Sequence, residues 1–190
     1  MTTNANINKV YPGMLDSSFE FFRAHNGLKV MSSGTVYDFH EIPITIYQFL
    51  KEKMESEPEV HTILKGWFPD SELQQLEKFA ECRFGGLDFT PDIINHVAQE
   101  SEYWDCPLRG VCKGEGKVCK HLKYNGEIID AMDIKIMRLI AAETKNEVIS
   151  EIVDVPYGSF HKIKTALYKK LDNANTKEKA VLVAHRLNLI

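Results

Sequence analysis

The sequence predicts a mostly α-helical protein of two domains, and three observations support this. Apolar residues recur at helical spacing along much of the chain, three of the four cysteines fall between residues 106 and 119, and the charge changes sign toward the C-terminus. We therefore expect an N-terminal helical domain over residues 1–128, with a small hairpin and a cysteine-rich metal loop, and a four-helix domain over residues 129–190.

Length and composition are those of an ordinary globular protein. The chain has 190 residues, 44% hydrophobic and 26% charged, enough for one large domain or two small ones. No apolar run approaches the roughly 18 residues of a membrane span, and the N-terminus lacks the pattern of a secretory signal. We therefore expect a cytoplasmic protein without membrane contact, in which clustered cysteines are metal ligands or redox thiols rather than disulfides.

The N-terminal part is expected to form helices around one hairpin. A tail of about a dozen residues is expected to be mobile, and a short helix is expected to end near Gly27. The runs on either side of Ser32-Ser33-Gly34 alternate apolar and polar residues, which predicts a hairpin. Pro43 opens a segment with helical periodicity, and Pro58 interrupts it.

Two further helices are expected before the cysteine-rich loop. Pro69-Asp70-Ser71 supplies an N-cap for the first, whose apolar face contains Leu73, Leu76 and Phe79. Thr90-Pro91-Asp92 is another start signal and predicts the second helix.

The cysteines and one histidine have the composition of a metal site, in the order Cys82-x23-Cys106-x5-Cys112-x6-Cys119-x-His121. Structural zinc needs four tetrahedral nitrogen or sulfur ligands, usually in close pairs. These spacings are wider than a Cys-x2-Cys knuckle, but the glycines of the loop allow the backbone to turn around an ion. We expect zinc on the four cysteines, with His121 as the alternative to Cys82.

Two alternatives to zinc stay open for this cluster (residues 82–121). The spacing of Cys106, Cys112 and Cys119 resembles the ligand loops of some bacterial iron–sulfur repressors, which would make the site an iron or redox sensor. The thiols could also be unligated, although the loop is hydrophilic and free cysteine prefers burial. The neighbouring Glu102 and Asp105 are expected to lie on a solvated face.

The C-terminal part carries most of the positive charge. Residues 131–190 contain ten Lys or Arg and seven Asp or Glu, a net charge of +3, whereas residues 1–130 carry −7. The stretch from Val155 to Leu171 has no acidic residue and holds Lys162, Lys164, Lys169 and Lys170. A local basic segment on an acidic protein indicates an anionic partner that binds at one place.

Four helices are expected after residue 129. Asp130 caps the first, which has a broad apolar face. A short amphipathic helix over residues 145–155, a turn and a longer basic helix over residues 158–171 follow, and a fourth helix starts near Thr176. A short helix, a turn and a basic helix form the helix-turn-helix pattern.

From about Ile129 to its end the sequence resembles the LuxR-type (response-regulator output) DNA-binding domain. Departures from that family include Val148 for a capping Glu, Ile163 for a common His, and Asp172 for a Gly. The segments that carry the resemblance are the apolar run 136–141, Val148-Ile149-Ser150, Val155-Pro156, Ser159-Phe160-His161, Lys169-Lys170-Leu171 and Leu187-Asn188-Leu189-Ile190.

This resemblance implies binding to double-stranded DNA as a homodimer. It places His161, Lys162 and Thr165 at the base edges of the major groove. It gives phosphate contacts to Tyr157, Ser159, Lys164 and Lys169. It also implies a dimer contact on the last helix, at Ala180, Val181 and Ala184.

We expect a DNA-binding transcriptional regulator whose N-terminal domain is stabilised by metal and senses a signal, binds a protein or dimerises. The alternative is a protein-interaction module whose helix-turn-helix no longer binds DNA. An enzyme is not expected, because the sequence has no phosphate-binding glycine loop, nucleophile elbow or paired-carboxylate signature.

Overall fold

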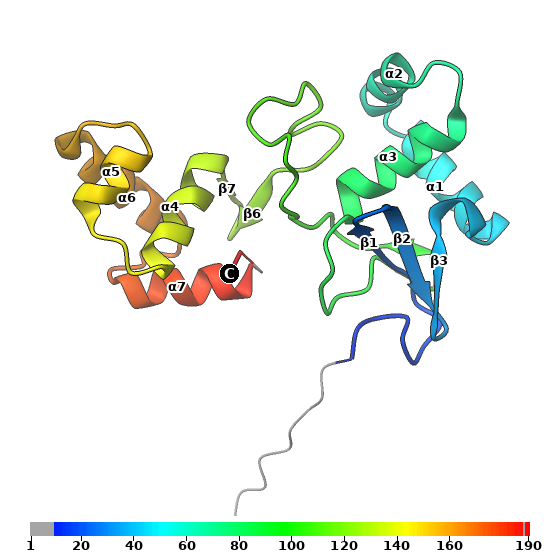
Figure 1. The fold of residues 1–190 in the computed structure, drawn as a ribbon, viewed down its shortest axis with the longest axis horizontal. Helices are drawn as coiled ribbons and strands as arrows, with labels where there is room; N and C mark the ends of the chain where they lie inside the picture. Colours follow the sequence, from blue (N-terminus) through cyan, green and yellow to red (C-terminus); the bar gives the residue numbers. More distant parts are fainter. Residues whose placement is uncertain (1–9, 188) are drawn as a thin grey trace, which may run out of the picture. The chain divides into compact units, whose positions relative to one another are not determined.

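The computed structural model describes residues 10–187 and 189–190, which divide into two compact units (Figure 1). The first unit runs to Cys106 and includes Lys113–Lys120. The second contains Pro107–Cys112 and His121–Ile190, so it includes more of the chain than the segment 129–190. Most of the tail that is expected to be mobile lies in residues 1–9, which are outside the described residues. Asn188, one of the residues that carry the family resemblance, is also outside them.

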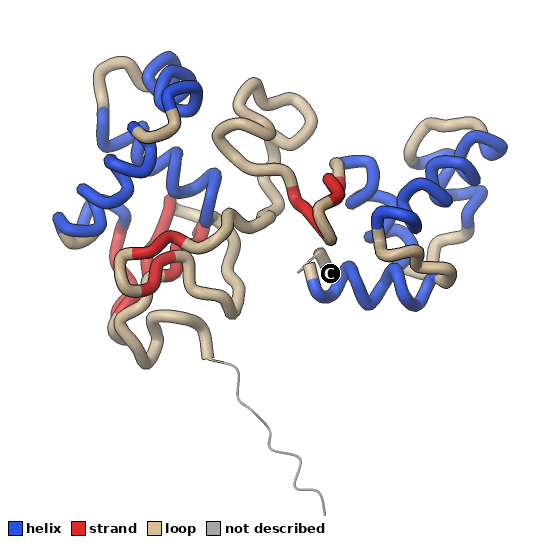
Figure 2. Tube along the Cα trace, turned by 180° about the vertical axis from the view of Figure 1, so that it is seen from behind, coloured by secondary structure: helices blue, strands red, loops and turns tan. Residues whose placement is uncertain are grey.

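A three-stranded antiparallel sheet opens the first unit (Figure 2). Its strands are β1 (Glu20–Ala24), β2 (Gly27–Ser32) and β3 (Thr35–Asp38), in that order. The hairpin expected around Ser33-Gly34 is confirmed, with positive φ at both residues as a type I′ turn requires. The short helix expected before Gly27 is wrong. Phe21 pairs with Val30 in the ladder and both are buried, so strand pairing prevails there.

Three helices follow, α1 (Ile44–Glu55), α2 (Pro58–Trp67) and α3 (Glu72–Phe84). Helices α1 and α3 lie where they are expected, and Pro58, expected only to interrupt the pattern, begins a helix of its own. A 3₁₀ turn, Phe39–Glu41, precedes them. The side chain of Ser71 accepts a hydrogen bond from the Gln74 amide at 3.3 Å, which confirms the N-cap. Helix α3 packs against β1, α1 and α2. Leu76 and Phe79 are buried as expected, whereas Leu73 is exposed.

The helix expected at Thr90-Pro91-Asp92 is wrong, because the segment forms the hairpin of β4 (Ile93–Ile94) and β5 (Val97–Ala98). Asp92 does not cap a local helix; its Oδ2 accepts a hydrogen bond from the Phe21 amide at 2.7 Å. Asn95 and His96 both have positive φ, which is the backbone of a two-residue type I′ turn.

Arg83, near the end of α3, fixes the segment 113–120 to the first unit. Its guanidinium is buried, and Nη2 lies 2.8 Å from Oε2 of Glu57. Nε donates to the carbonyl of Val118, and Nη2 lies 3.3 Å from the carbonyl of Lys117. Burial acts to raise the pKa of Glu57, but its hydrogen bond and charge interaction with Arg83, together with those from Lys120, hold it below its usual value.

The second unit begins with the hairpin of β6 (Leu122–Tyr124) and β7 (Glu127–Ile129), which turns at Asn125-Gly126. The four expected helices follow as α4 (Ala131–Ala141), α5 (Asn146–Ile152), α6 (Tyr157–Lys170) and α7 (Lys177–Arg186). Asp130 caps α4 in a reciprocal box with Asp133. Lys170 lies 2.5 Å from Asp133, which joins the end of α6 to the start of α4.

Helix α4 packs on α7, and α5 packs on α6. The core of this unit contains Ile136, Met137, Ile140, Ile149, Phe160, Leu167 and Ala184. None of the helices in the described residues combines the length and apolar character that crossing a membrane needs.

Replacing Arg83 with Met should lower the free energy of unfolding of the first unit by about 3–5 kcal/mol, because it leaves Glu57 and two carbonyls without their buried donor. Urea denaturation measures the change. Lys117→Ala is the matched control, since it removes an ion pair with Glu59 in which both side chains are at least half exposed. It should cost less than about 1 kcal/mol. Equal losses in the two variants would show that the Arg83 network is not structural.

Candidate nucleic-acid interface and cysteine site

The turn between α5 and α6 sets the direction of the basic helix. The Val155 amide donates to the Ser150 carbonyl at 3.0 Å and the Asp154 amide to the Glu151 carbonyl at 3.1 Å. Together they close the end of α5 in the manner of a Schellman motif. Asp154 takes the left-handed conformation, with φ of 55°. Aspartate tolerates this conformation better than most residues, so the turn forms without glycine.

Helix α6 has two distinct faces. Phe160 and Leu167 are fully buried in the core of the second unit, and Ile163 is half-buried. On the opposite side the helix surface is hollowed between His161, Lys162, Thr165, Ala166 and Lys169. Four of the seven expected DNA-contacting residues therefore lie together on one accessible face.

Tyr157 and Ser159 lie exposed at the N-terminal end of α6. The Tyr157 hydroxyl donates to Oε1 of Glu147 on α5 at 3.0 Å, and this hydrogen bond raises the pKa of Tyr157. The Tyr157 ring also meets the His161 ring edge to face, with centroids 4.8 Å apart. The start of α6 is thus tied to α5 by a phenol–carboxylate contact.

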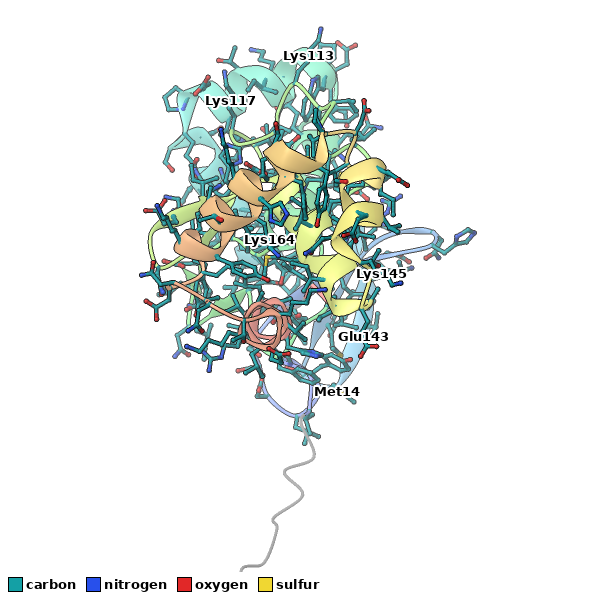
Figure 3. All side chains as sticks on the ribbon, turned by 90° about the vertical axis from the view of Figure 1, so that its left-hand side faces the viewer. Met14, Lys113, Lys117, Glu143, Lys145 and Lys164 are labelled. Atoms are coloured by element: carbon teal, nitrogen blue, oxygen red, sulfur yellow. The ribbon has the colours of Figure 1, made fainter. Side chains whose placement is uncertain are left out.

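Lys164 is less accessible than Lys162 and Lys169 of the same helix. Its Nζ lies 3.4 Å from Oδ1 of Asn146 and 5.7 Å from the centre of the Tyr168 ring. Burial, with a smaller contribution from Lys177, lowers the pKa of Lys164. Figure 3 shows Lys164 on α6, and Glu143 and Lys145 on the turn before α5.

Three of the expected thiol ligands lie in the first unit. Cys82 on α3 and Cys119 in the segment 113–120 are buried, and Cys106 is half-buried. Burial, opposed by the charge of Lys78 and helped by smaller contributions from Cys119, Glu81 and Cys106, raises the pKa of Cys82 to about 12. Cys112 and His121 belong to the chain segments of the second unit.

Local turns give the segment 113–120 its shape. The Val118 amide donates to the Gly114 carbonyl at 2.8 Å, and Gly116 has φ of 75°, a left-handed conformation that glycine adopts without strain. A Cβ added to Gly114 would lie 2.5 Å from the Trp67 ring, so this glycine allows the segment to approach α2 closely.

Carboxylates, rather than thiols, form the metal-ligand group that converges in the described part of the chain. One oxygen each of Glu20, Asp88 and Glu102 lies within 4.8 Å of the other two. Sequence reasoning missed this group, because the three residues come from separate segments with no common spacing. Glu102, expected on a solvated face, is only partly accessible and accepts a hydrogen bond from the Gly86 amide.

Comparison with known proteins gives no relative for this chain: no protein-family model, no curated protein and no solved structure matches it.

The turn before α6 offers a direct test of its left-handed residue. Asp154→Gly should raise the free energy of unfolding of the second unit by about 0.5–1 kcal/mol, since it removes the cost of a side chain at positive φ. Asp154→Val, which places a β-branched residue there, should lower it by about 1–2 kcal/mol. Thermal unfolding followed by circular dichroism measures both. A destabilising glycine would show that the Asp154 side chain contributes more than its backbone costs.

Proposed function

We propose that this protein is a DNA-binding transcriptional regulator in which α6 enters the major groove. The observation that carries the proposal is the accessible face of α6, where His161, Lys162, Thr165 and Lys169 surround a shallow hollow. Phe160 and Leu167 anchor the opposite face, so the helix presents these polar side chains on a rigid support.

The dimensions and chemistry of this face suit duplex DNA. An α-helix with its side chains is about 10–12 Å wide, which matches the major groove. His161, Lys162 and Thr165 can donate or accept hydrogen bonds at base edges, and Lys169 supplies a charge for phosphate. Ser159 at the start of the helix would be a further phosphate contact, and Lys164 would contribute through its charge. Tyr157 could contact phosphate only by exchanging its hydrogen bond with Glu147 for one with the phosphate.

Charge favours α6 over α5 as the reading element. No acidic residue occurs from Val155 to Leu171, whereas α5 carries Glu147 and Glu151. A phosphate beside α5 would meet these carboxylates, so the duplex is expected to follow α6.

A homodimer that uses α7 would need residues other than Ala180 and Ala184. Ala180 and Ala184 are buried against α4 within the same chain, so they are not accessible for a dimer contact. Leu182 is 57% exposed and Val181 is half-buried, which makes them the apolar residues of α7 that a second copy could cover.

We also propose that Cys82, Cys106 and Cys119 bind zinc in the first unit, with an iron–sulfur cluster as the alternative. Cys106 and Cys119 lie near enough to Cys82 to contribute to the raised pKa of its thiol, and thiols are donors that zinc accepts. Zinc would bind thiolates and release their protons, so binding would weaken as the pH falls. The first unit would then be a metal-stabilised effector or interaction domain.

One observation favours a second function, binding of a protein instead of DNA. Val148 and Ile152, one helical turn apart on α5, are 41% and 43% exposed, and Tyr157, whose hydroxyl bonds Glu147 of α5, is 42% exposed. Such an apolar surface beside the basic helix suits a protein partner.

Lys162→Glu should weaken binding to duplex DNA at least tenfold at about 50 mM salt, and should flatten the dependence of log Kd on log salt by one to two ion equivalents. Fluorescence anisotropy with a labelled duplex measures both quantities. Lys179→Glu, the same charge change on an exposed position of α7, is the control and should change binding much less. Equal weakening by both variants would contradict specific use of α6, and salt-independent binding would favour the protein-interaction function.

Metal analysis of the protein purified without oxygen should give one zinc per chain and no visible absorbance, and Cys119→Ser should lower the zinc content to below about half. Iron with a brown absorbance band would establish the iron–sulfur alternative instead. The zinc contents of the variants Cys112→Ser and His121→Ala show whether either residue is needed for full zinc retention. Protein without metal, whose stability does not change in Cys119→Ser, would contradict both.

A further inference from the structure

The first unit contains a convergent group of carboxylates that neither DNA binding nor the cysteine site uses. Glu20 begins β1, Asp88 lies in the loop after α3, and Glu102 lies in the loop after β5. One oxygen of each lies within 4.8 Å of the other two. Asp92 is a fourth carboxylate, nearly fully buried, close enough for the charges of Glu102 and Glu20 to act on it.

Glu20 carries an independent sign that this group lacks a ligand. Its side chain is fully buried, and only one of its two oxygens is satisfied: Oε1 accepts the Asp88 amide at 2.9 Å. Oε2 is shielded from solvent and has no hydrogen-bond partner among the described residues. A buried carboxylate oxygen without a donor is costly, so such an atom calls for a proton or a cation.

The other members of the group are held in place by backbone donors. The Gly86 amide donates to Oε1 of Glu102, and the Phe21 amide donates to Oδ2 of Asp92. The Glu102 amide in turn donates to the Arg83 carbonyl at 3.0 Å. A Cβ at Gly86 would lie 2.8 Å from Oε1 of Glu102, so a side chain at position 86 would shift the Glu102 carboxylate.

Burial and mutual repulsion oppose the ionisation of these carboxyl groups. Burial, with a contribution from Asp88, raises the pKa of Glu20 to about 8. Burial and the Asp88 charge likewise raise the pKa of Glu102 to about 8. Near pH 7 Glu20 and Glu102 therefore keep their protons unless a positive charge replaces them, and a cation at their centre would do so for the whole group.

We propose that Glu20, Asp88 and Glu102, supported by Asp92, bind a hard divalent cation of the size of Ca²⁺ or Mn²⁺. Ca²⁺ takes oxygen ligands at about 2.3–2.6 Å, so two oxygens on opposite sides of the ion lie about 5 Å apart. The ligand oxygens of Glu20, Asp88 and Glu102, one from each, all lie within 4.8 Å of one another, so one ion of this kind could reach all three. Thiols select softer metals such as zinc, so the carboxylate group and the cysteine site would take different ions.

The test is calorimetric titration of the full chain at pH 7 with Ca²⁺, and separately with Mn²⁺. We expect one ion per chain, saturating below about 1 mM, and a rise in Tm on binding. Glu102→Gln keeps the shape of the side chain and should weaken binding at least tenfold. Glu100→Gln, an exposed position in the same loop, should leave it unchanged. Asp88→Asn provides a second variant if Glu102→Gln does not fold.

Absence of binding of both ions to the wild-type chain at 10-fold higher concentration, about 10 mM, would overturn the proposal and would mean that the carboxylates are satisfied by protons. Binding that Glu102→Gln and Asp88→Asn leave unchanged would overturn it too. DNA binding does not enter these measurements, so their outcome is independent of the function proposed above.

Discussion

The architecture of the first unit depends on Arg83. Its buried guanidinium joins the end of α3 to Glu57 and to the carbonyls of the segment 113–120, and its own carbonyl accepts the amide of Glu102. Cys82 precedes Arg83 in the chain, and Cys119 follows the carbonyl that Arg83 binds. Arg83 therefore fixes the chain beside the thiols of Cys82 and Cys119, and its carbonyl fixes the backbone of Glu102. Because a buried guanidinium must have all its partners, these segments have little freedom to move apart.

A comparable division of roles organises the second unit. Phe160 and Leu167 fix α6 in the core, and the ion pair of Lys170 with Asp133 fixes its end to α4. The other face of α6 is not packed in the core, so its polar side chains determine what it can bind. That face carries lysines, a histidine and a threonine around a hollow, and it is the surface on which the proposal of DNA binding rests.

The C-terminal helices could be predicted from the sequence, and much of the N-terminal unit could not. The capping residue Asp130 and the apolar periodicity are local signals, and the four helices form where these signals indicate. The strand β1 was missed because its identity depends on pairing with β2, and the start signal at Asp92 was misread because its carboxylate binds the distant Phe21 amide. Local propensity is a weak guide where such tertiary contacts decide.

Whether a candidate site could be predicted from the sequence likewise depends on whether its residues belong to one local element or to distant segments. The exposed face of α6 follows from helical periodicity, so four of its residues could be placed together from sequence alone. The carboxylates of Glu20, Asp88 and Glu102 come from three segments that only the fold brings together. Burial of Lys164 beside Tyr168, and of Ala180 and Ala184 against α4, likewise depends on packing.

The most direct test of DNA binding by α6 is an NMR titration of the ¹⁵N-labelled chain with a short duplex at low salt, where the phosphate interaction is strongest. Amide shifts that move with added duplex should concentrate between Tyr157 and Lys169. No shifts, or shifts confined to Val148 and Ile152 on α5 or to the first unit, would contradict the proposed interface.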